Sequence, residues 1–303
     1  FIASDVPAIL SHTRNVLFLD DEEVVTLSPD GVSVTTLAGE PVQKQVQKIL
    51  WTPIMAEKGG YKHFMLKEIY EQPRALRDTI RGRFSMETGQ LYLEGLESIE
   101  GALATIKRIV LVACGTSWHA GLIGKFLLEE LVRIPVEVDY GSEFRYRDPI
   151  LDEETLVLTI SQSGETLDTL VSLREARRHG CKSLAICNVV GSTLSRESDG
   201  VLYTHAGPEI GVASTKAFTS QLAALYLLAL ALGRARGRID AARSQELLSE
   251  LVRLPQQMEQ VLRLDSELDQ LASRFYAASN FLYLGRGINY PIALEGALKL
   301  KEI

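Results

Sequence analysis

A short apolar run that ends in a hydroxyl-rich turn most constrains how this chain folds. Residues 156–160 (Leu-Val-Leu-Thr-Ile) read as a buried strand of a parallel sheet. The turn Ser161–Thr166 (Ser-Gln-Ser-Gly-Glu-Thr) follows, and a helical pattern begins at Leu167. Because free amides and the positive end of the dipole meet at a helix N-terminus, this unit predicts an anion site. The turn contains no Lys or Arg and is not a Walker A loop, so it suits a phosphomonoester better than a triphosphate.

A simpler interpretation of the same turn is helix capping. Ser163 and Thr166 are residue types that cap helices, and Asp168 would complete a capping box. The two interpretations are compatible, because a capped helix end also presents amides to an anion.

Composition narrows the class of protein. The chain has 303 residues, 46% of them hydrophobic, which gives room for roughly two domains with full cores. A formal charge of −7 argues against nucleic acid or an anionic membrane surface as a partner, and the longest apolar run, 222–232, is too short to span a bilayer. The chain has three cysteines, Cys114, Cys181 and Cys187, without the paired spacing of a metal site, so we expect reduced thiols and a cytoplasmic location. The histidines form no HExxH motif, so we expect no metal.

The first 50 residues are rich in β-structure signals. Strands are predicted at 16–19, 23–27 and 32–36, with a hairpin turn at 28–31. Both ends of the chain look cut, since there is no initiator Met and the last residues read as mid-helix. We therefore expect a fragment of a longer protein, with these strands belonging to a larger sheet.

Alternating strands and helices follow a polar connection in which a helix starts near His63 and Pro73 interrupts or re-caps it. The predicted strands are 108–113, 136–140, 156–160, 182–187 and 200–205. This alternation predicts an α/β fold with a doubly wound parallel sheet, in which ligands bind at the carboxyl ends of the strands. A long helix from about Thr215 and one or two amphipathic helices over 240–273, broken or kinked at Pro255, complete the pattern.

Two further loops are candidates for the same ligand. Residues 114–117 (Cys-Gly-Thr-Ser) follow a strand as the first turn does, so both can face one ligand. The loop 209–216 (Glu-Ile-Gly-Val-Ala-Ser-Thr-Lys) also ends at a helix start, with an ordinary Ser/Thr cap as the alternative.

The end of the chain repeats the start of the sheet. Residues 281–288 align with 109–116, glycine on glycine, which predicts a strand at 281–284, a following helix and a truncated second copy of the domain. On that helix Glu295, Lys299 and Glu302 share one face, an arrangement that suits proton abstraction beside a carbonyl. A solvated salt-bridging face is the alternative.

Several longer motifs resemble the glutamine–fructose-6-phosphate aminotransferase (isomerizing) family. They are 1–5, 67–73, 113–117, 161–166, 186–189, 209–219 and 290–303. The resemblance implies five parts in chain order. Residues 1–50 are the tail of an Ntn-hydrolase glutaminase domain, 51–95 an interdomain linker and 96–238 a flavodoxin-like sugar isomerase (SIS) domain. Residues 239–272 are connecting helices, and 273–303 are the truncated start of a second SIS domain.

The resemblance also implies an activity in cytoplasmic amino-sugar biosynthesis. The family converts fructose 6-phosphate and glutamine to glucosamine 6-phosphate and glutamate, without a cofactor, and the resemblance suggests a homodimer formed through the SIS domains. Glu302 matches the base that moves a proton between C1 and C2, and Lys299 matches its companion. The implied substrate-binding residues are Thr116, Ser117, Ser161, Gln162, Ser163, Thr166, Val212, Ala213 and Ser214.

Departures from the family pattern limit what this chain should do alone. The family's amino-terminal cysteine nucleophile is absent, because position 1 here is Phe. The family's ring-opening histidine and imine-forming lysine would lie after Ile303. We expect hexose-phosphate binding, but glutamine binding only with the N-terminal part and no complete reaction. A non-enzymatic SIS sugar-phosphate sensor and a fructosamine-6-phosphate deglycase are the alternatives; Glu302 counts against the first and residues 1–50 against both.

Overall fold

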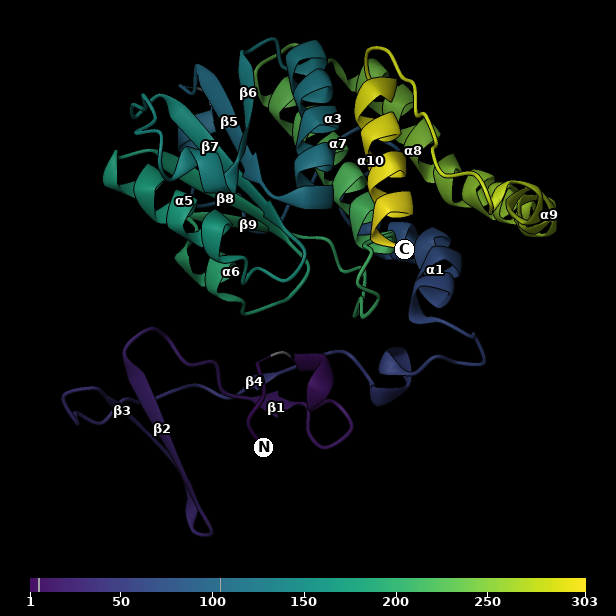
Figure 1. The fold of residues 1–303 in the computed structure, drawn as a ribbon. Helices are drawn as coiled ribbons and strands as arrows, with labels where there is room; N and C mark the ends of the chain where they lie inside the picture. Colours follow the sequence, from purple (N-terminus) through teal and green to yellow (C-terminus); the bar gives the residue numbers. More distant parts are fainter. Residues whose placement is uncertain (5, 104) are drawn as a thin grey trace.

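A five-stranded parallel sheet forms the main body of the computed structural model, which describes residues 1–4, 6–103 and 105–303 (Figure 1). The strand order is β6-β5-β7-β8-β9. The bounds are β5 (Arg108–Ala113), β6 (Val136–Tyr140), β7 (Thr155–Ser161), β8 (Lys182–Cys187) and β9 (Gly200–Tyr203). The predicted doubly wound sheet and its five strands are confirmed, with end shifts of one or two residues in β7 and β9.

Both faces of this sheet are covered by helices, because its central strands are apolar on both sides. Alternate residues of β5 point to opposite cores: Ile109 and Leu111 join one cluster, Val110 and Val112 another. The first face packs against α1 (Phe64–Ile80), α3 (Gly115–Leu131), α7 (Lys216–Ala235) and α8 (Ala241–Leu262), and the short α2 (Glu100–Leu103) contributes to the same core. The second face packs against α4 (Gly141–Phe144), α5 (Leu167–Arg178) and α6 (Thr193–Glu197).

Helix α7 lies at the centre of the first layer. Among the described residues it is the one helix long and apolar enough to cross a membrane. Of its apolar stretch, 72% is buried inside the fold. That degree of burial is typical of a helix inside a protein core, which matches the buried helix predicted from its sequence.

Helix α1 runs through Pro73 without interruption, so the prediction that Pro73 interrupts or re-caps it was wrong. Proline lacks the N–H that would bond the carbonyl four residues earlier, which here belongs to Ile69. The Gln72 side chain donates to that carbonyl oxygen through Nε2 at 3.0 Å. The substitute donor explains how the helix continues, and α8 likewise contains Pro255 within its length.

The N-terminal part lies below the sheet in Figure 1 and has a small core of its own. Its elements are η1 (Val6–Ala8), β1 (Asn15–Val16), β2 (Glu23–Ser28), β3 (Gly31–Thr36), β4 (Gln47–Lys48) and η2 (Pro53–Ala56). The predicted hairpin is confirmed, with Ser28 paired to Gly31, whereas only Val16 of the predicted strand 16–19 is in a strand. Asp5, part of the first motif of the resemblance, lies outside the described residues.

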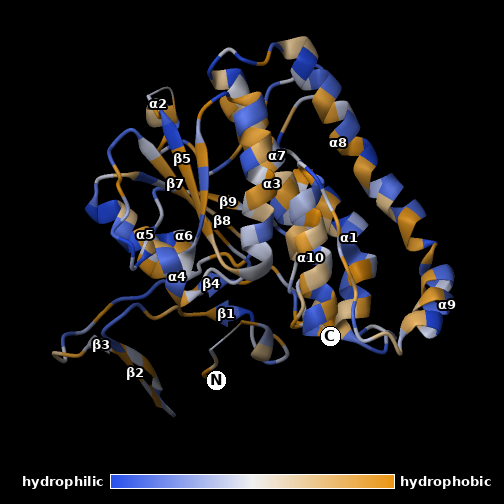
Figure 2. Ribbon diagram, turned by 45° about the horizontal axis from the view of Figure 1, so that its top comes forward, coloured by the Kyte–Doolittle hydropathy of each residue, from blue (hydrophilic) through white to orange (hydrophobic). Residues whose placement is uncertain are grey.

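The C-terminal part contains α9 (Asp265–Phe275) and α10 (Asn289–Glu302). Figure 2 shows α8 and α9 as alternating hydrophobic and hydrophilic residues, which confirms the amphipathic pattern. The strand predicted at 281–284 is not formed, and that prediction was wrong. A parallel strand depends on neighbours for its hydrogen bonds, and these residues pair with no other strand of the described chain.

Candidate functional site

The order of the strands reverses at β5, because β6 lies on one side of it and β7 on the other, and two of the predicted loops lie at this point. Ala113 pairs with Ile160 at the carboxyl ends of the two strands, so the turns that follow are neighbours. Each turn leads into a helix, α3 or α5. The point at which the strand order reverses, at the carboxyl ends of the strands, is where open α/β sheets bind ligands.

The turn Ser161–Thr166 is held by its own hydroxyls. Ser161 Oγ accepts the Gly164 amide at 3.0 Å and lies 3.0 Å from Thr166 Oγ1. Gly164 has φ +70°, and a Cβ there would lie 2.1 Å from Ser192 Oγ. Both the left-handed backbone and the close approach require glycine.

Neighbouring segments fix the same turn from outside. Gln162 O accepts the Asn188 amide at 3.1 Å, and Gly164 O accepts the Leu194 amide at 2.9 Å. Within the part of the chain that the structure describes, the amides of Ser163 and Thr166 have no partner. The turn therefore presents free donors from a fixed backbone, as an anion site needs.

The capping interpretation of this turn was wrong. Thr166 stands at the N-cap position of α5, but its side chain makes no capping hydrogen bond and contacts Ser161 instead. Asp168 closes no capping box; its carboxylate accepts from Arg145 Nη1 at 2.8 Å. The N-terminal amides of α5 are left without a side-chain cap.

The second turn begins helix α3 and connects to two other helices. Ser117 Oγ accepts from Gln221 Nε2 of α7 at 3.0 Å, which leaves its hydroxyl hydrogen available. Thr116 Oγ1 donates to Glu295 Oε1 and accepts from Lys299 Nζ, both at 3.0 Å. Thr116 thus contacts α10 directly, and Figure 1 shows α10 lying beside α3.

A buried carboxylate organises the contact between α3 and α10. Glu295 is 6% exposed; its Oε2 lies 2.7 Å from His119 Nδ1, and its Oε1 lies 3.3 Å from Lys299 Nζ. Burial raises the pKa of Glu295, but the His119 hydrogen bond and the Lys299 charge outweigh it, so the net pKa is lowered. Lys299 Nζ also lies 2.7 Å from Glu302 Oε2, so the ion pairs of the salt-bridging alternative are present. That alternative was wrong for Glu295 in expecting a solvated face, because Glu295 is buried.

The loop Glu209–Lys216 is fixed by a carboxylate. Glu209 accepts the amides of Thr215 at 2.9 Å and Ala217 at 3.1 Å, and the Ser214 hydroxyl at 2.8 Å. The alternative of an ordinary Ser/Thr cap was therefore wrong, since Glu209 caps α7. Val212 at the tip of the loop is 96% exposed.

The structure brings together some of the predicted site residues. Thr116, Lys299 and Glu302 form one hydrogen-bonded chain, and Ser161 contacts Thr166. Sequence reasoning placed Glu295 on one helix face with Lys299 and Glu302 but did not predict its contact with Thr116, and it missed His119. His119 lies three residues after Thr116, on the same face of α3, and that spacing was the available signal.

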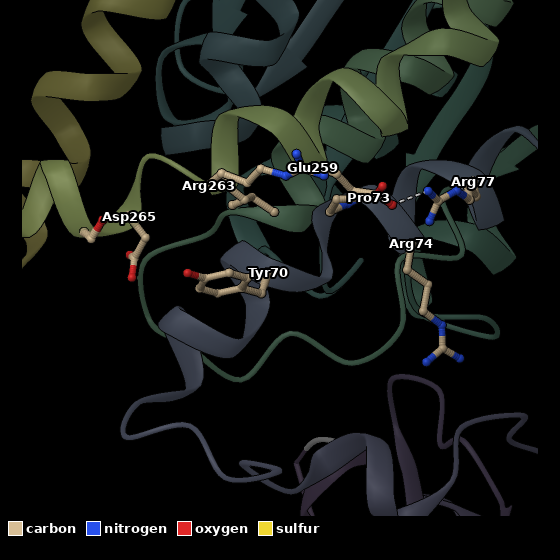
Figure 3. A pocket seen from close by; sticks show the side chains of 9 residues that line it. Tyr70, Pro73, Arg74, Arg77, Glu259, Arg263 and Asp265 are labelled. Atoms are coloured by element: carbon tan, nitrogen blue, oxygen red, sulfur yellow. Dashed lines mark hydrogen bonds and ion pairs between the residues drawn. The ribbon is translucent and has the colours of Figure 1, made fainter.

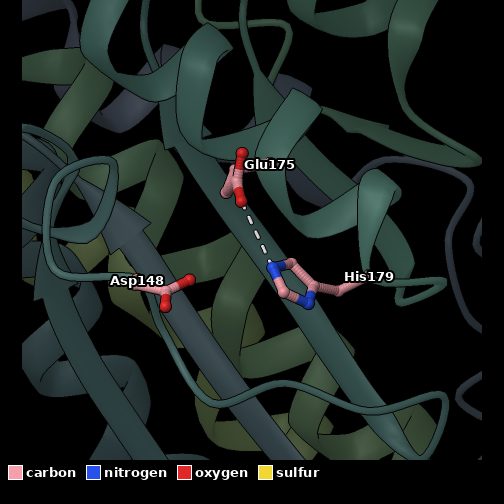
Figure 4. A group of neighbouring side chains, drawn as sticks. All are labelled: Asp148, Glu175 and His179. Carbon is pink, nitrogen blue, oxygen red and sulfur yellow. Dashed lines mark hydrogen bonds and ion pairs between the residues drawn. The ribbon is translucent and has the colours of Figure 1, made fainter.

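Two other features do not coincide with these residues. An open hollow of about 540 Å³ lies between α1 and the α8–α9 corner, where Arg77 pairs with Glu259 (Figure 3). Asp148, Glu175 and His179 bring ligand atoms within 4.8 Å of one another (Figure 4), but this group is partly solvent-exposed and includes an ordinary i,i+4 contact. Neither feature lies at the carboxyl ends of β5 and β7.

Comparison with known proteins gives consistent matches. The SIS domain family matches residues 102–231. The chain is 51% identical over 302 residues to a glutamine–fructose-6-phosphate aminotransferase (isomerizing) of Symbiobacterium thermophilum and 53% identical over 304 residues to that of Thermus thermophilus. Each alignment covers 100% of this chain and 50% of the relative, so the chain spans about half the length of these relatives.

A solved structure matches the chain in the same way. It is the C-terminal domain of glucosamine-fructose-6-phosphate aminotransferase from Francisella tularensis, with 44% sequence identity and a TM-score of 0.78. The alignment covers 82% of this chain and 69% of that structure.

Proposed function

The chain belongs to the glutamine–fructose-6-phosphate aminotransferase (isomerizing) family, and from this premise we propose that it binds fructose 6-phosphate and carries groups of the isomerase half of the reaction. In the whole protein, glutamine supplies ammonia and leaves as glutamate, and the sugar leaves as glucosamine 6-phosphate. The observation that carries the proposal is the fixed turn Ser161–Thr166, whose free amides lie where the strand order of the sheet reverses.

The sugar phosphate binds at this turn. The hydroxyls of Ser161, Ser163 and Thr166 and the amides at the start of α5 supply donors without a cationic side chain. Thr116 and Ser117 contribute from the neighbouring turn, and Gln162 lies on the same loop. Val212, Ala213 and Ser214 line the sugar from the α7 side.

The acid–base chemistry belongs to α10. Ammonia first forms an imine at C2 with loss of water. Glu302 then removes a proton from C1 while the imine nitrogen gains one, which gives an enamine between C1 and C2. Glu302 returns its proton to C2 as the C1 hydroxyl loses its proton, which leaves the amine on C2 and an aldehyde at C1. Lys299 lies 2.7 Å from Glu302 and 3.0 Å from Thr116, so it positions the base relative to the phosphate turns. Phosphate binding fixes the sugar, and such positioning supplies several kcal/mol of rate enhancement.

The finer organisation follows the family. We assign 1–50 to the tail of an Ntn-type glutaminase domain, 51–95 to a linker, 96–238 to the first SIS domain, 239–272 to connecting helices and 273–303 to the start of a second SIS domain. The protein functions as a cytoplasmic homodimer joined through its SIS domains. The apolar run at 281–284, which aligns with β5, supports the last boundary.

Calorimetric titration of fructose 6-phosphate tests the proposal. The chain should bind saturably, and Ser161→Ala/Ser163→Ala should bind at least tenfold more weakly, since each hydrogen bond to a charged group contributes about 1.5–3 kcal/mol. Ser33→Ala/Ser142→Ala, which removes two hydroxyls outside the turn, is the matched control and should bind like the parent. Undiminished binding by the first variant, or none by the parent chain, would overturn the assignment of the site to this chain.

A further inference from the structure

A buried carboxylate on α1 holds the loop that follows β9. Glu68 is 2% exposed, and its Oε1 accepts the amides of Ile210 at 2.6 Å and Gly211 at 3.0 Å. Its Oε2 lies 3.2 Å from the Gly211 amide. A buried carboxylate is costly unless donors compensate it, so these two backbone amides explain why Glu68 is tolerated there.

The loop backbone lies directly on α1 at this point. A Cβ on residue 211 would lie 2.5 Å from Glu68 Oε2 and 3.3 Å from the Met65 backbone. Gly211 does not have a positive φ, so its role here is the close approach and not an unusual backbone conformation. Any side chain at 211 would move the loop away from Glu68.

A second carboxylate holds the other end of the same loop, because Glu209 binds the amides of Thr215 and Ala217. Between the two anchors, the Val212 side chain is 96% exposed and makes little packing contribution. Residues 212–214 thus lie between backbone hydrogen bonds to two carboxylates, with Ala213 buried and the Ser214 hydroxyl donating to Glu209 at 2.8 Å. The Glu68 anchor comes from a helix that precedes the sheet domain in the sequence.

We infer that Glu68 is a positioning residue that holds the loop 209–216 in place for the sugar. This inference rests on the proposed function, in which residues 212–214 line the sugar site. Glu68 itself does not touch the substrate; it acts through the Ile210 and Gly211 amides. Burial raises the pKa of Glu68, and the hydrogen bonds from those two amides offset only part of this rise, so the carboxylate depends on the loop backbone for its remaining stabilisation.

The electrostatic surroundings fit this role. On the loop side, the charges of Lys216 and Glu209 act on Glu68, and Lys216 Nζ lies 2.6 Å from Glu71. Lys67 Nζ binds Met55 O at 2.6 Å and lies 3.4 Å from Glu71. Lys216 and Lys67 are thus both paired with Glu71, which leaves the loop amides as the direct partners of Glu68.

Steady-state kinetics of the full-length enzyme test the inference. Glu68→Ala should raise the KM for fructose 6-phosphate about tenfold or more, with a smaller change in kcat. Glu68→Gln should recover most of this loss, because the amide oxygen can take the place of Oε1 and accept both N–H groups. Asp78→Asn is the matched control: it removes a carboxylate from the same helix, at a surface ion pair with Arg74, and should keep the parent KM.

A second variant keeps the charge and displaces the loop. Gly211→Ala should raise the KM to a similar degree, and combining it with Glu68→Ala should add little, because both break the same contact. If Glu68→Ala does not fold, Gly211→Ala and Glu68→Gln carry the test. A merely structural role predicts a lower Tm and kcat with unchanged KM, and that result would overturn the inference.

The two proposals fail in different ways. If the parent chain binds fructose 6-phosphate through the Ser161–Thr166 turn but Glu68→Ala and Gly211→Ala keep the parent KM, only the positioning role is wrong. If the parent chain does not bind the sugar phosphate at all, the site assignment itself is wrong.

Discussion

At the scale of single residues, one carboxylate joins the two groups of the proposed site. Glu295 accepts from Thr116 next to the phosphate turns and contacts Lys299, which in turn contacts Glu302. His119 supplies the third contact of Glu295, on the other carboxylate oxygen. The turn that contains Thr116 and the proposed base are thus connected by hydrogen bonds through a side chain with little solvent access.

Removing this carboxylate should destabilise the fold. Glu295→Ala leaves Lys299 and His119 without their buried partner, and breaking a buried pair costs about 3 kcal/mol or more. Urea unfolding should show this loss. Glu302→Gln, at the more exposed end of the series of hydrogen-bonded side chains, should change stability little. Equal stability of the parent and Glu295→Ala would show that α10 does not depend on this contact.

The same carboxylate predicts a pH dependence. Its pKa is lowered in the folded state, so its stabilising contribution is complete above the unfolded value of about 4.3 and is lost as pH falls through the lower folded value. Between pH 5 and pH 3 the parent should lose more unfolding free energy than Glu295→Gln. Parallel pH profiles for the two proteins would contradict the lowered pKa.

The cysteines should differ in reactivity. Burial raises the pKa of Cys187 to about 12 and that of Cys181 to about 11, so both remain protonated thiols near neutral pH. Cys114 is partly exposed at the start of α3. Iodoacetamide should therefore label Cys114 first in the native protein, as read by peptide mass spectrometry, and early labelling of Cys187 would show that β8 is less well packed than described.

Local signals determined which of these residues could be predicted. The turn Ser161–Thr166 was recognised because strand, hydroxyls, glycine and helix are contiguous in the sequence. Glu68 could not be recognised in that way, since its partners lie 142 and 143 positions further along the chain. The tertiary fold alone brings that pair together.

At the scale of elements, the buried strands were predictable and the exceptions have physical causes. Strands β5 and β8 match their predicted bounds because a strand buried on both faces is a continuous apolar run. The run at 281–284 is also continuously apolar, but among the described residues no strand pairs with it. Composition therefore indicates the capacity to form a strand, and pairing decides whether the strand forms.

Helix α1 offers a test of how proline is tolerated inside a helix. Gln72→Ala should cost about 1 kcal/mol, because it removes the donor to Ile69 O that replaces the missing Pro73 N–H. With Pro73→Ala in the background, the alanine amide takes that carbonyl and Gln72→Ala should cost little. A double-mutant cycle of unfolding free energies measures the difference, and an equal cost in both backgrounds would exclude this role of Gln72.

At the scale of the whole molecule, burial is distributed unevenly. The sheet and α7 hold most of the large buried side chains, whereas α9 contains no buried residue. Figure 1 shows α9 extending away from the sheet. The sequence indicated an amphipathic helix at this place, but amphipathicity does not specify what the apolar face packs against.

The exposed apolar side chains of α9 should be detectable by a hydrophobic dye. Leu268 and Leu271 are 56% and 44% exposed, so Leu268→Glu/Leu271→Glu should lower dye fluorescence and leave the main thermal transition unchanged. The matched pair Leu170→Glu/Leu173→Glu places the same charges on α5, where the leucines are 6% and 0% exposed, and should abolish folding. A large fall in Tm for the α9 variant would mean that this helix packs against the domain in solution. An unchanged Tm would mean that the sheet domain, with both proposed phosphate turns, folds independently of α9.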